Sequence, residues 1–405
     1  MSDRELGRPF WTLWTAFSAS NLGDGLSLVG MPLLAIQLTD DARLVAAVAV
    51  FQYLPFLIIG LPAGVVLDRF DRRWIAAIAQ LLRALVLAVL VATVLADGAG
   101  IRVLMGVSFL IGASEVMTDG GLPALIRELV KSNQLEVANA RLMATQRVTN
   151  AFIGPPLGAL LFEVESWLPF AVAATMSLVS VATLTQLPGR YKAPQTEAPT
   201  AFLVQATTGL RYVWAHPVLR PLALTVATFS FVGAAGNAVF VVLVTERFGM
   251  GGLGFGLLMS VEAVAAVLMT FFVARLILST SHATSMRFSV VSFTIGALLF
   301  GLTTVAATAF VAAVILGTSD PAWNTVSSTV RQRLVPDEVF GRMMTAYLFI
   351  GWGMKPLGAL LGGVVAETWG AEWVSLGSAF TVGSLFVFAR PMFRRVDAAM
   401  ANASD

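Results

Sequence analysis

Seven ionisable residues interrupt the long apolar stretches of this chain, and their side chains are the ones best able to do chemistry. Five are acids and two are bases: Asp24, Arg83, Glu115, Asp119, Glu262, Asp320 and Lys355. A charged side chain inside a bilayer costs about 2.5–3.5 kcal/mol on insertion scales, so these residues are expected to face an internal cavity. Because acids outnumber bases, some carboxylates should hold a proton near neutral pH and could carry protons.

Four of these residues lie in the first half of the chain. Asp24 is predicted to line a cavity that binds protons or substrate, or else to contact Arg83 or another polar neighbour in helix packing. Arg83 is predicted to be the counter-ion within the membrane, unless it only tethers its own helix. Glu115 and Asp119 are four residues apart, which places both acids on one helical face, where they should influence each other's titration.

The second half offers further candidates. Lys355 could neutralise Asp320, bind an anionic group or extend outward to the interface. Asp320, like Glu115, is a predicted coupling or gating residue, with helix-to-helix bonding as the structural alternative. Amides in the apolar stretches could line the same cavity or join helices: Asn21, Asn150 and Asn324.

The composition identifies the elements that must position these residues. Of 405 residues, 57% are hydrophobic and 12% are charged, whereas soluble domains have about 25% charged residues. The excess apolar surface must face lipid, and a helix needs about 20 apolar residues to cross a bilayer. Twelve segments meet this requirement, near 10–37, 44–67, 73–95, 102–126, 140–162, 167–187, 218–245, 252–277, 286–306, 309–331, 340–366 and 371–391.

The distribution of basic residues predicts the orientation. Among the connecting segments, one side of the membrane holds only Arg43, Arg102 and Arg247, and the remaining arginines and lysines gather on the other side. Basic residues favour the cytoplasmic side, so both termini and the central loop are predicted to lie in the cytoplasm, with the chain in the cell membrane.

Several classes of site are excluded or disfavoured. The chain has no cysteine, which excludes disulfides and thiolate metal sites. Its two histidines, His216 and His282, lie near predicted loops, which argues against a histidine metal site or catalytic triad. There is no G-x-x-x-x-G-K-[ST] loop for ATP, and the scattered basic residues do not suggest nucleic acid. We therefore expect no cofactor, no enzymatic activity and energy from an ion or substrate gradient.

The chain contains an internal repeat. Residues 156–161 (PLGALL) recur as 356–361, and residues 111–115 (IGASE) parallel 316–320 (LGTSD). Spans four and five therefore match spans ten and eleven, with an even number of spans between the copies. Parallel halves suit alternating access, in which one bundle rocks against the other. The copies differ where Lys355 aligns with Pro155.

This repeat predicts an all-α membrane protein of twelve transmembrane helices in two pseudo-symmetric six-helix bundles. The predicted parts are an N-terminal bundle at 1–187, a cytoplasmic linker at 188–216 and a C-terminal bundle at 217–405. Within the linker, apolar residues recur at helical spacing over 202–214. That segment is predicted either to be a short helix on the inner membrane surface or merely to join the two halves.

Two motifs resemble those of the major facilitator superfamily. Residues 64–73 resemble its loop motif G-x-x-x-D-R-x-G-R-R, with Asp71 in place of a glycine, and residues 150–159 resemble the exporter motif G-x-x-x-G-P-x-x-G-G. The first resemblance predicts a cytoplasmic latch of Gly64, Asp68, Arg69, Arg72 and Arg73. The second predicts a bend and a gating role for Gly154, Pro155 and Gly158.

Three further segments, 21–25, 138–143 and 331–338, resemble the enterobactin-exporter and macrolide-efflux branch. The resemblance implies a proton-coupled exporter (an antiporter) of small, partly apolar compounds such as drugs, siderophores or metabolites. The usual arginine in span four is absent, and Glu115 lies in that region. The alternative is an uptake facilitator, or a lipid or lysolipid flippase, of the same fold. The expected partners are a small-molecule substrate, protons and the lipid bilayer, and the expected state is a monomer.

Overall fold

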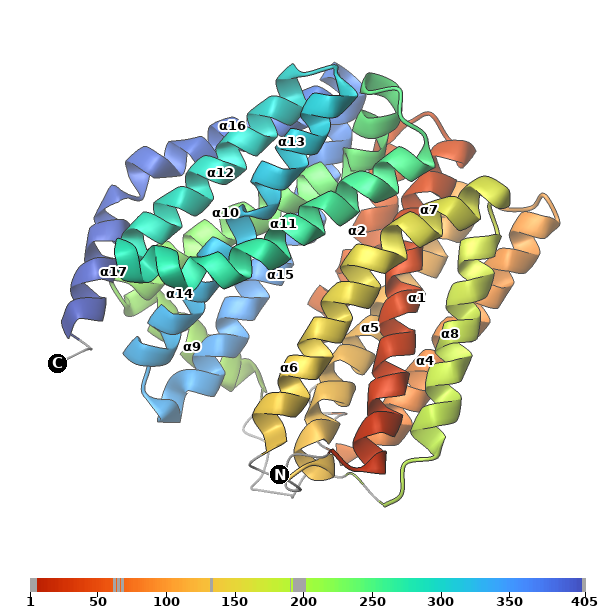
Figure 1. Cartoon of the computed structure of the whole chain (residues 1–405), viewed down its shortest axis with the longest axis horizontal. Coiled ribbons are helices and arrows are strands. Elements are labelled where there is room, and N and C mark those ends of the chain that lie inside the picture. The colour runs from red at the N-terminus through yellow and green to blue at the C-terminus, as the bar shows by residue number, and fades with distance from the viewer. Residues whose placement is uncertain are drawn as a thin grey trace. The chain divides into compact units, whose positions relative to one another are not determined.

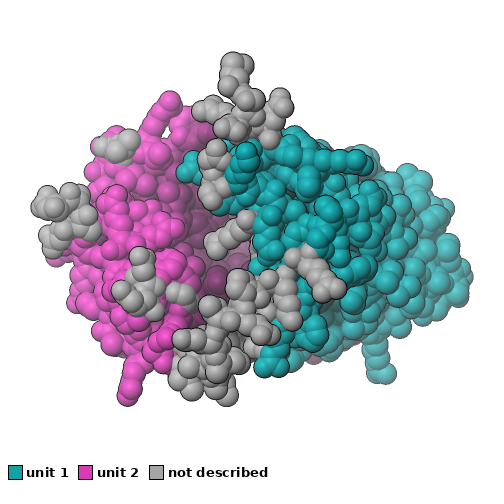
Figure 2. All heavy atoms as spheres, turned by 90° about the horizontal axis from the view of Figure 1, so that it is seen from below, with its two compact units in different colours: residues 1–40, 47–197, 251–260 teal, residues 41–46, 198–250, 261–405 magenta. Residues whose placement is uncertain are grey.

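The computed structural model describes residues 6–60, 63, 66, 69–131, 134–189, 191 and 202–402. All regular secondary structure in these residues is helical (Figure 1). Ten of the described helices are long and apolar enough to cross a membrane. The chain divides into two compact units, coloured separately in Figure 2, which comprise residues 1–40, 47–197 and 251–260, and residues 41–46, 198–250 and 261–405.

The first unit is built mainly from the N-terminal helices, in which α1 packs against α8, α7 and α5, and α4 packs between α5 and α8. Their bounds are α1 Arg8–Leu38, α2 Ala42–Ile58, α4 Arg72–Leu95, α5 Ile101–Leu129, α6 Leu135–Gln146, η3 Arg147–Ile153, α7 Gly154–Val164 and α8 Leu168–Thr185.

The second unit contains the remaining helices, in which α10 packs against α15 and α12 packs against α16. Their bounds are α9 Phe202–Ala215, α10 Leu219–Val242, η4 Leu243–Arg247, α11 Gly252–Ser279, α12 His282–Leu302, α13 Ala306–Gly317, α14 Ser319–Leu334, α15 Asp337–Trp369, α16 Ala371–Phe388 and α17 Arg390–Asn402. The first residues of α2 group with this unit and the first residues of α11 with the other.

Two predicted spans coincide with helices that are shorter than a full crossing. The segment predicted at 44–67 contains α2, which ends at Ile58, close to residues outside the described part of the chain. The segment predicted at 140–162 is divided into α6, the π-helix η3 and α7. These two segments account for the difference between twelve predicted spans and the ten helices found among the described residues.

The tenth predicted span is broken at Thr318. Pro321 lacks the N–H that would bond to the Gly317 carbonyl, so α13 ends and α14 begins beside it. The Thr318 hydroxyl donates to the Ile315 carbonyl at 2.7 Å and satisfies one of the carbonyls at the end of α13. Asp320 therefore lies in the first turn of α14, where a helix stabilises negative charge.

The segment 202–214 forms a helix, α9, that packs against α15. A Cβ atom at Gly209 would lie 2.0 Å from the Arg342 carbonyl oxygen, which shows how close the two backbones are. Val213 is fully buried in the core of the second unit. The segment is helical, as the first alternative predicts, and its position on the inner membrane surface stays a prediction.

The repeated segments pack in equivalent ways within their own units. Gly112 of α5 and Gly317 of α13 occupy matching positions in the repeat. A Cβ at Gly112 would lie 2.2 Å from the Gln52 carbonyl oxygen, and one at Gly317 would lie 2.3 Å from the Glu262 carbonyl oxygen. Because each glycine has no side chain, the backbone of a neighbouring helix can pack directly against it. Gln52 and Glu262, which make these contacts, therefore occupy equivalent positions in the two units.

A second glycine pair behaves in the same way. Gly158 of α7 lies against the Leu26 backbone of α1, and Gly358 of α15 lies against the Phe231 backbone of α10. Leu26 and Phe231 are therefore equivalent positions. The structure thus shows that α1 and α10 are equivalent helices. The repeated sequence blocks do not include either helix.

Candidate transport site

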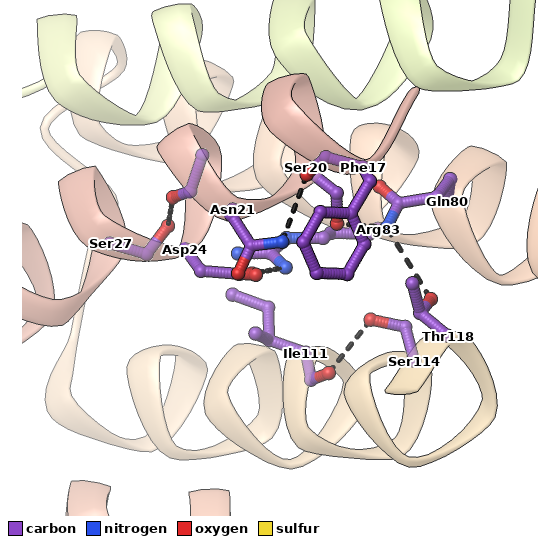
Figure 3. A network of polar contacts seen from close by, with 11 residues as sticks. Phe17, Ser20, Asn21, Asp24, Ser27, Gln80, Arg83, Ile111, Ser114 and Thr118 are labelled. Carbon is purple, nitrogen blue, oxygen red and sulfur yellow. Dashed lines mark hydrogen bonds and ion pairs between the residues drawn. The ribbon is translucent and has the colours of Figure 1, made fainter. Parts of the chain in front are cut away.

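The first unit contains a buried polar network formed by α1, α4 and α5 (Figure 3). Arg83 of α4 forms an ion pair with Asp24 of α1, and its side chain is 1% exposed, compared with 17% for Asp24. One turn earlier on α4, the Gln80 amide donates to the Ser20 hydroxyl at 2.6 Å and lies 3.4 Å from the Thr118 hydroxyl. The predicted contact between Asp24 and Arg83 is present.

The network contains more acidic than basic side chains. The carboxylates of Glu115 and Asp119 on α5 lie within electrostatic range of the Arg83 guanidinium, so three carboxylates share one buried base. Glu115 is half-buried and Asp119 is exposed at the surface of the unit. Among the described residues, Arg83 Nε and Nη2 and the side-chain Oε1 of Gln80 are buried without a hydrogen-bond partner. These atoms remain available for a rearranged set of partners.

Sequence reasoning did not include Gln80, Ser20 or Thr118. Gln80 precedes Arg83 by three residues, and Ser20 precedes Asp24 by four, so each pair shares one face of its helix. Polar residues one turn from an intramembrane ion pair are the signal that could have identified them.

The predicted amides have different environments. The Asn21 amide donates to the Phe17 carbonyl of its own helix at 2.9 Å and is buried. Asn150 is half-buried, and its backbone carbonyl lies against Gly25, where a Cβ would be 2.5 Å away. Asn324 of α14 is exposed at the surface of the second unit.

The second unit has a different chemistry at the positions that match the ion pair. Because Leu26 matches Phe231, Asp24 matches Phe229, which is an aromatic residue. The Phe229 ring lies 5.2 Å from that of Trp323 and 5.4 Å from that of Phe293. An aromatic cluster therefore stands in the second unit where the first unit has its ion pair.

Three ionisable residues of the second unit lie on α11, α14 and α15. The carboxylates of Glu262 and Asp320 are within electrostatic range of each other. Asp320 is exposed at the surface of its unit and Lys355 is half-buried. The Lys355 ammonium lies 3.6 Å from the centroid of the Trp352 ring, in a cation–π contact.

Gly154, Pro155 and Gly158 lie at a break in the fifth predicted span. Pro156 cannot donate to the Phe152 carbonyl, and this carbonyl instead accepts a hydrogen bond from the Ser260 hydroxyl at 3.0 Å. The preceding turn, η3, is a π-helix. A Cβ at Gly154 would lie 2.6 Å from the Gly25 Cα, so the break lets α1 approach closely beside Asp24.

The predicted latch is described in part, because Gly64 and Asp68 lie outside the described residues. Arg69 is exposed, and Arg72 lies 3.5 Å from Glu128 at the end of α5. Burial raises the pKa of Glu128, and the Arg72 guanidinium opposes this shift. The Arg73 guanidinium donates to the Leu187 carbonyl.

Asp71, the departure from the family motif, has a specific role at the start of α4. Its carboxylate caps the helix by accepting from the Arg73 N–H at 3.0 Å, and it also accepts from the Tyr191 N–H at 3.3 Å. The Arg72 N–H donates to the Tyr191 carbonyl at 3.0 Å. Burial of Tyr191 raises the pKa of its hydroxyl. The chain after α8 is thus fastened to the start of α4, which the sequence did not indicate.

Arg331, at the end of a predicted span and counted with the cytoplasmic arginines, is only 9% exposed. It lies in the last turn of α14, where it donates to the Ser327 hydroxyl at 2.6 Å and stacks 4.0 Å from the Tyr347 ring centroid. The negative end of α14 stabilises its charge there. The burial of Arg331 follows from packing against α15, which a count of charges cannot reveal, and its cytoplasmic position stays a prediction.

Comparison with known proteins agrees with this architecture. The family model described as "Transmembrane secretion effector", within the major facilitator superfamily, matches residues 7–405. The chain belongs to this family. It is therefore a multi-pass membrane transporter of an efflux branch of the superfamily, and not an enzyme.

Full-length relatives support the family assignment. The multidrug efflux pump Tap of Mycolicibacterium fortuitum is 25% identical over 98% of this chain and 99% of its own length. The multidrug efflux pump Tap of Mycobacterium tuberculosis strain H37Rv is 24% identical over 98% of this chain and 97% of its own. The crystal structure of the nucleoside transporter NupG has a TM-score of 0.78 at 14% identity, covering 96% and 99% of the two chains. This last likeness shows the transporter fold alone.

Proposed function

We propose that this transmembrane secretion effector is a proton-coupled antiporter that exports small, partly apolar compounds such as drugs, siderophores or metabolites. The names of the Tap relatives, multidrug efflux pumps, support export of drugs. The observation that carries proton coupling is the buried Asp24–Arg83 ion pair, with Glu115 and Asp119 in electrostatic range of the same guanidinium. A base shared by several carboxylates can exchange one partner for another when a proton binds.

The proposed coupling step is a change of partner for Arg83. Asp24 is the partly accessible member of the pair. When Asp24 is ionised, it holds Arg83, and when it binds a proton, this attraction is lost and Glu115 or Asp119 becomes the stronger partner. Since α1 also contacts α7 beside Asp24, at Gly25 and Gly154, the change of charge would act on the packing of the broken fifth span. Gly154, Pro155 and Gly158 are the proposed gating elements.

The proposal includes the finer architecture predicted from sequence. It has twelve spans in two six-helix bundles, at 1–187 and 217–405, joined by a cytoplasmic linker at 188–216. A monomer with both termini in the cytoplasm would work by alternating access in the cell membrane. Asp320, Lys355, Asn21, Asn150 and Asn324 would line the substrate path, and Gly64, Asp68, Arg69, Arg72 and Arg73 would form the cytoplasmic latch.

The test uses purified protein in proteoliposomes with an imposed pH gradient. A substrate is first found by ligand-dependent thermal shift across compound classes, because binding raises apparent stability. Transport should depend on the gradient in the wild type, and should lose that dependence in Asp24→Asn. Ser27→Ala, one turn away on α1, is the matched control and should transport normally. Gradient-independent transport by the wild type would refute proton coupling.

The alternative of the same fold is an uptake facilitator or a lipid or lysolipid flippase. A transport assay with a fluorescent lysolipid in the same proteoliposomes distinguishes the flippase from the proposed exporter. Movement of the lysolipid without movement of any soluble compound would favour the flippase.

A further inference from the structure

Four arginines of the second unit, Arg220, Arg390, Arg394 and Arg395, lie near two helix ends, where the chain leaves predicted membrane spans. Helix α17 begins two residues after α16, whose last residues Val387 and Phe388 are 55% and 79% exposed. The turn at 216–218 directly precedes the membrane-spanning helix α10. Both segments must therefore lie at the depth of lipid headgroups, whichever way the protein is oriented.

The two segments are in direct contact. The Arg395 guanidinium of α17 donates to the Pro217 carbonyl at 3.2 Å. Across the same turn, the Arg220 guanidinium lies 5.7 Å from the ring centroid of Trp214, which is 46% exposed. Two guanidinium groups thus flank one turn, beside an aromatic ring of the kind that prefers the membrane interface.

The apolar face of α17 is not free to enter the bilayer. Met392, Phe393, Val396 and Met400 are buried in the core of the second unit. The exposed side of the helix carries Arg390, Arg394 and Arg395. Among the described residues, Arg390 and Arg394 make no hydrogen bond or ion pair.

Acidic residues do not balance this charge. The segment 202–245 contains no aspartate or glutamate. The acid within α17, Asp397, accepts a hydrogen bond from the Ala283 N–H at the start of α12, at 2.8 Å. The single carboxylate of α17 therefore bonds to the start of α12. It does not form an ion pair with the described arginines of α17, whose side chains are exposed.

We propose that Arg220 and Arg395, with Trp214 and the exposed Arg390 and Arg394 of α17, form a binding site for the headgroup phosphate of an anionic phospholipid. Guanidinium groups bind phosphate through paired, charge-assisted hydrogen bonds, and the indole ring packs on the adjoining lipid. That this lipid comes from the inner leaflet rests on the orientation given under the proposed function. The binding of the lipid does not depend on that orientation.

The test uses the full-length protein in detergent and the melting temperature as the readout. Phosphatidylglycerol should raise it more than phosphatidylcholine with the same acyl chains, and added salt should reduce the difference. Each arginine removed should weaken phosphatidylglycerol binding about fivefold. Arg220→Gln/Arg395→Gln should therefore lose most of the lipid-dependent shift, measured against its own lipid-free value.

Two further variants and a soluble probe complete the design. Arg390→Gln/Arg394→Gln changes side chains that make no hydrogen bond or ion pair with the described part of the chain, so it should reduce the shift without lowering the lipid-free stability. Arg43→Gln/Arg102→Gln removes two arginines elsewhere and should keep the full shift.

Equal effects of the two lipids on the wild type, or an equal loss in the control, would overturn the proposal. Glycerol phosphate that reproduces the shift would assign the site to a free phosphate. Neither result depends on proton coupling or on the direction of transport.

Discussion

At the scale of single residues, the central feature is one arginine that is almost completely buried among carboxylates. Removing a guanidinium from water costs several kcal/mol, which only an opposite charge and hydrogen bonds can offset. Asp24 supplies the direct contact, and Glu115 and Asp119 supply longer-range attraction. Protonation of Asp24 would remove its attraction to Arg83, which is the change that the proposed coupling requires.

The ion pair should therefore contribute to folding as well as to transport. Asp24→Asn and Arg83→Gln should each lower the free energy of unfolding by about 3 kcal/mol, because each leaves a buried partner unpaired. The double variant should lose less than the sum, by at least about 1 kcal/mol. Denaturant unfolding in detergent measures all three. Ser27→Ala, whose hydroxyl bonds only to its own helix, should change stability by less than about 1 kcal/mol, and additive effects would argue against a direct pair.

At the scale of elements, glycines decide which helices touch. Gly112 and Gly317 occupy matching positions, and each leaves room for the carbonyl of a neighbouring helix. The same device brings α7 against α1 and α15 against α10. Close backbone contact replaces the hydrophobic driving force that is missing between helices in lipid.

A glycine-to-alanine substitution should therefore have different effects on stability at two positions of α5, one in close contact with another helix and one in open space. Gly112→Ala would place its Cβ 2.2 Å from the Gln52 carbonyl oxygen, and it should destabilise the protein by about 1–3 kcal/mol. Gly106→Ala on the same helix meets nothing within 4 Å and should be neutral or stabilising by up to about 1 kcal/mol. Thermal unfolding of both variants measures the difference, and similar losses at the two positions would contradict this packing.

The first turn of α10 should respond to pH through His216. Its Nδ1 accepts from the Val218 and Leu219 N–H groups at 3.2 Å each, which only the neutral ring can do. Burial lowers the pKa of His216 below its ordinary value of 6.5. The unfolded chain therefore binds the proton more tightly, so this contribution to stability is complete above pH 6.5 and is lost as the pH falls through the folded pKa.

Melting temperatures between pH 5.5 and 7.5 test this assignment. His216→Ala should lose about 1 kcal/mol at the upper pH and become less sensitive to acid. His216→Asn can accept the same backbone bonds but does not titrate, so it should keep the stability and lose the acid sensitivity. An unchanged acid response in His216→Asn would place the titrating group elsewhere.

At the scale of the whole molecule, two units share equivalent helix packing but not equivalent chemistry. The first unit has the buried ion pair, whereas the second has an aromatic cluster at the matching position of α10. The ends of their last helices also differ, since Tyr191 is held by Asp71 in one unit and α17 is held to α12 through Asp397 in the other. The two halves of the repeat thus share a packing scaffold but carry different side chains at matching positions.

The absence of cysteine makes the proposed orientation directly testable. A single cysteine at Gly98, exposed between α4 and α5, should react with a membrane-impermeant maleimide in intact cells. A single cysteine at Ser279, the exposed last residue of α11, should react only after the cells are broken. Labelling of Ser279→Cys in intact cells would reverse the predicted orientation.

The sequence by itself determined the class of structure and most of the candidate residues. A high apolar content, the spacing of apolar segments and the repeated PLGALL block need no tertiary information, because the bilayer imposes the same length and polarity on every span. The ionisable residues within those spans stand out for the same reason. Asp24 and Arg83 were therefore identifiable as possible partners before their contact was observed.

Only the tertiary structure decided which side chains share an environment. Gln80, Ser20 and Thr118 join the ion pair from three helices, and Tyr191 is fastened to Asp71 across a distance of 120 residues in sequence. Arg331 is buried against Tyr347 at the end of α14. Such contacts depend on how helices rotate and approach one another, which is set by the packing of many small residues and leaves no local pattern in the chain.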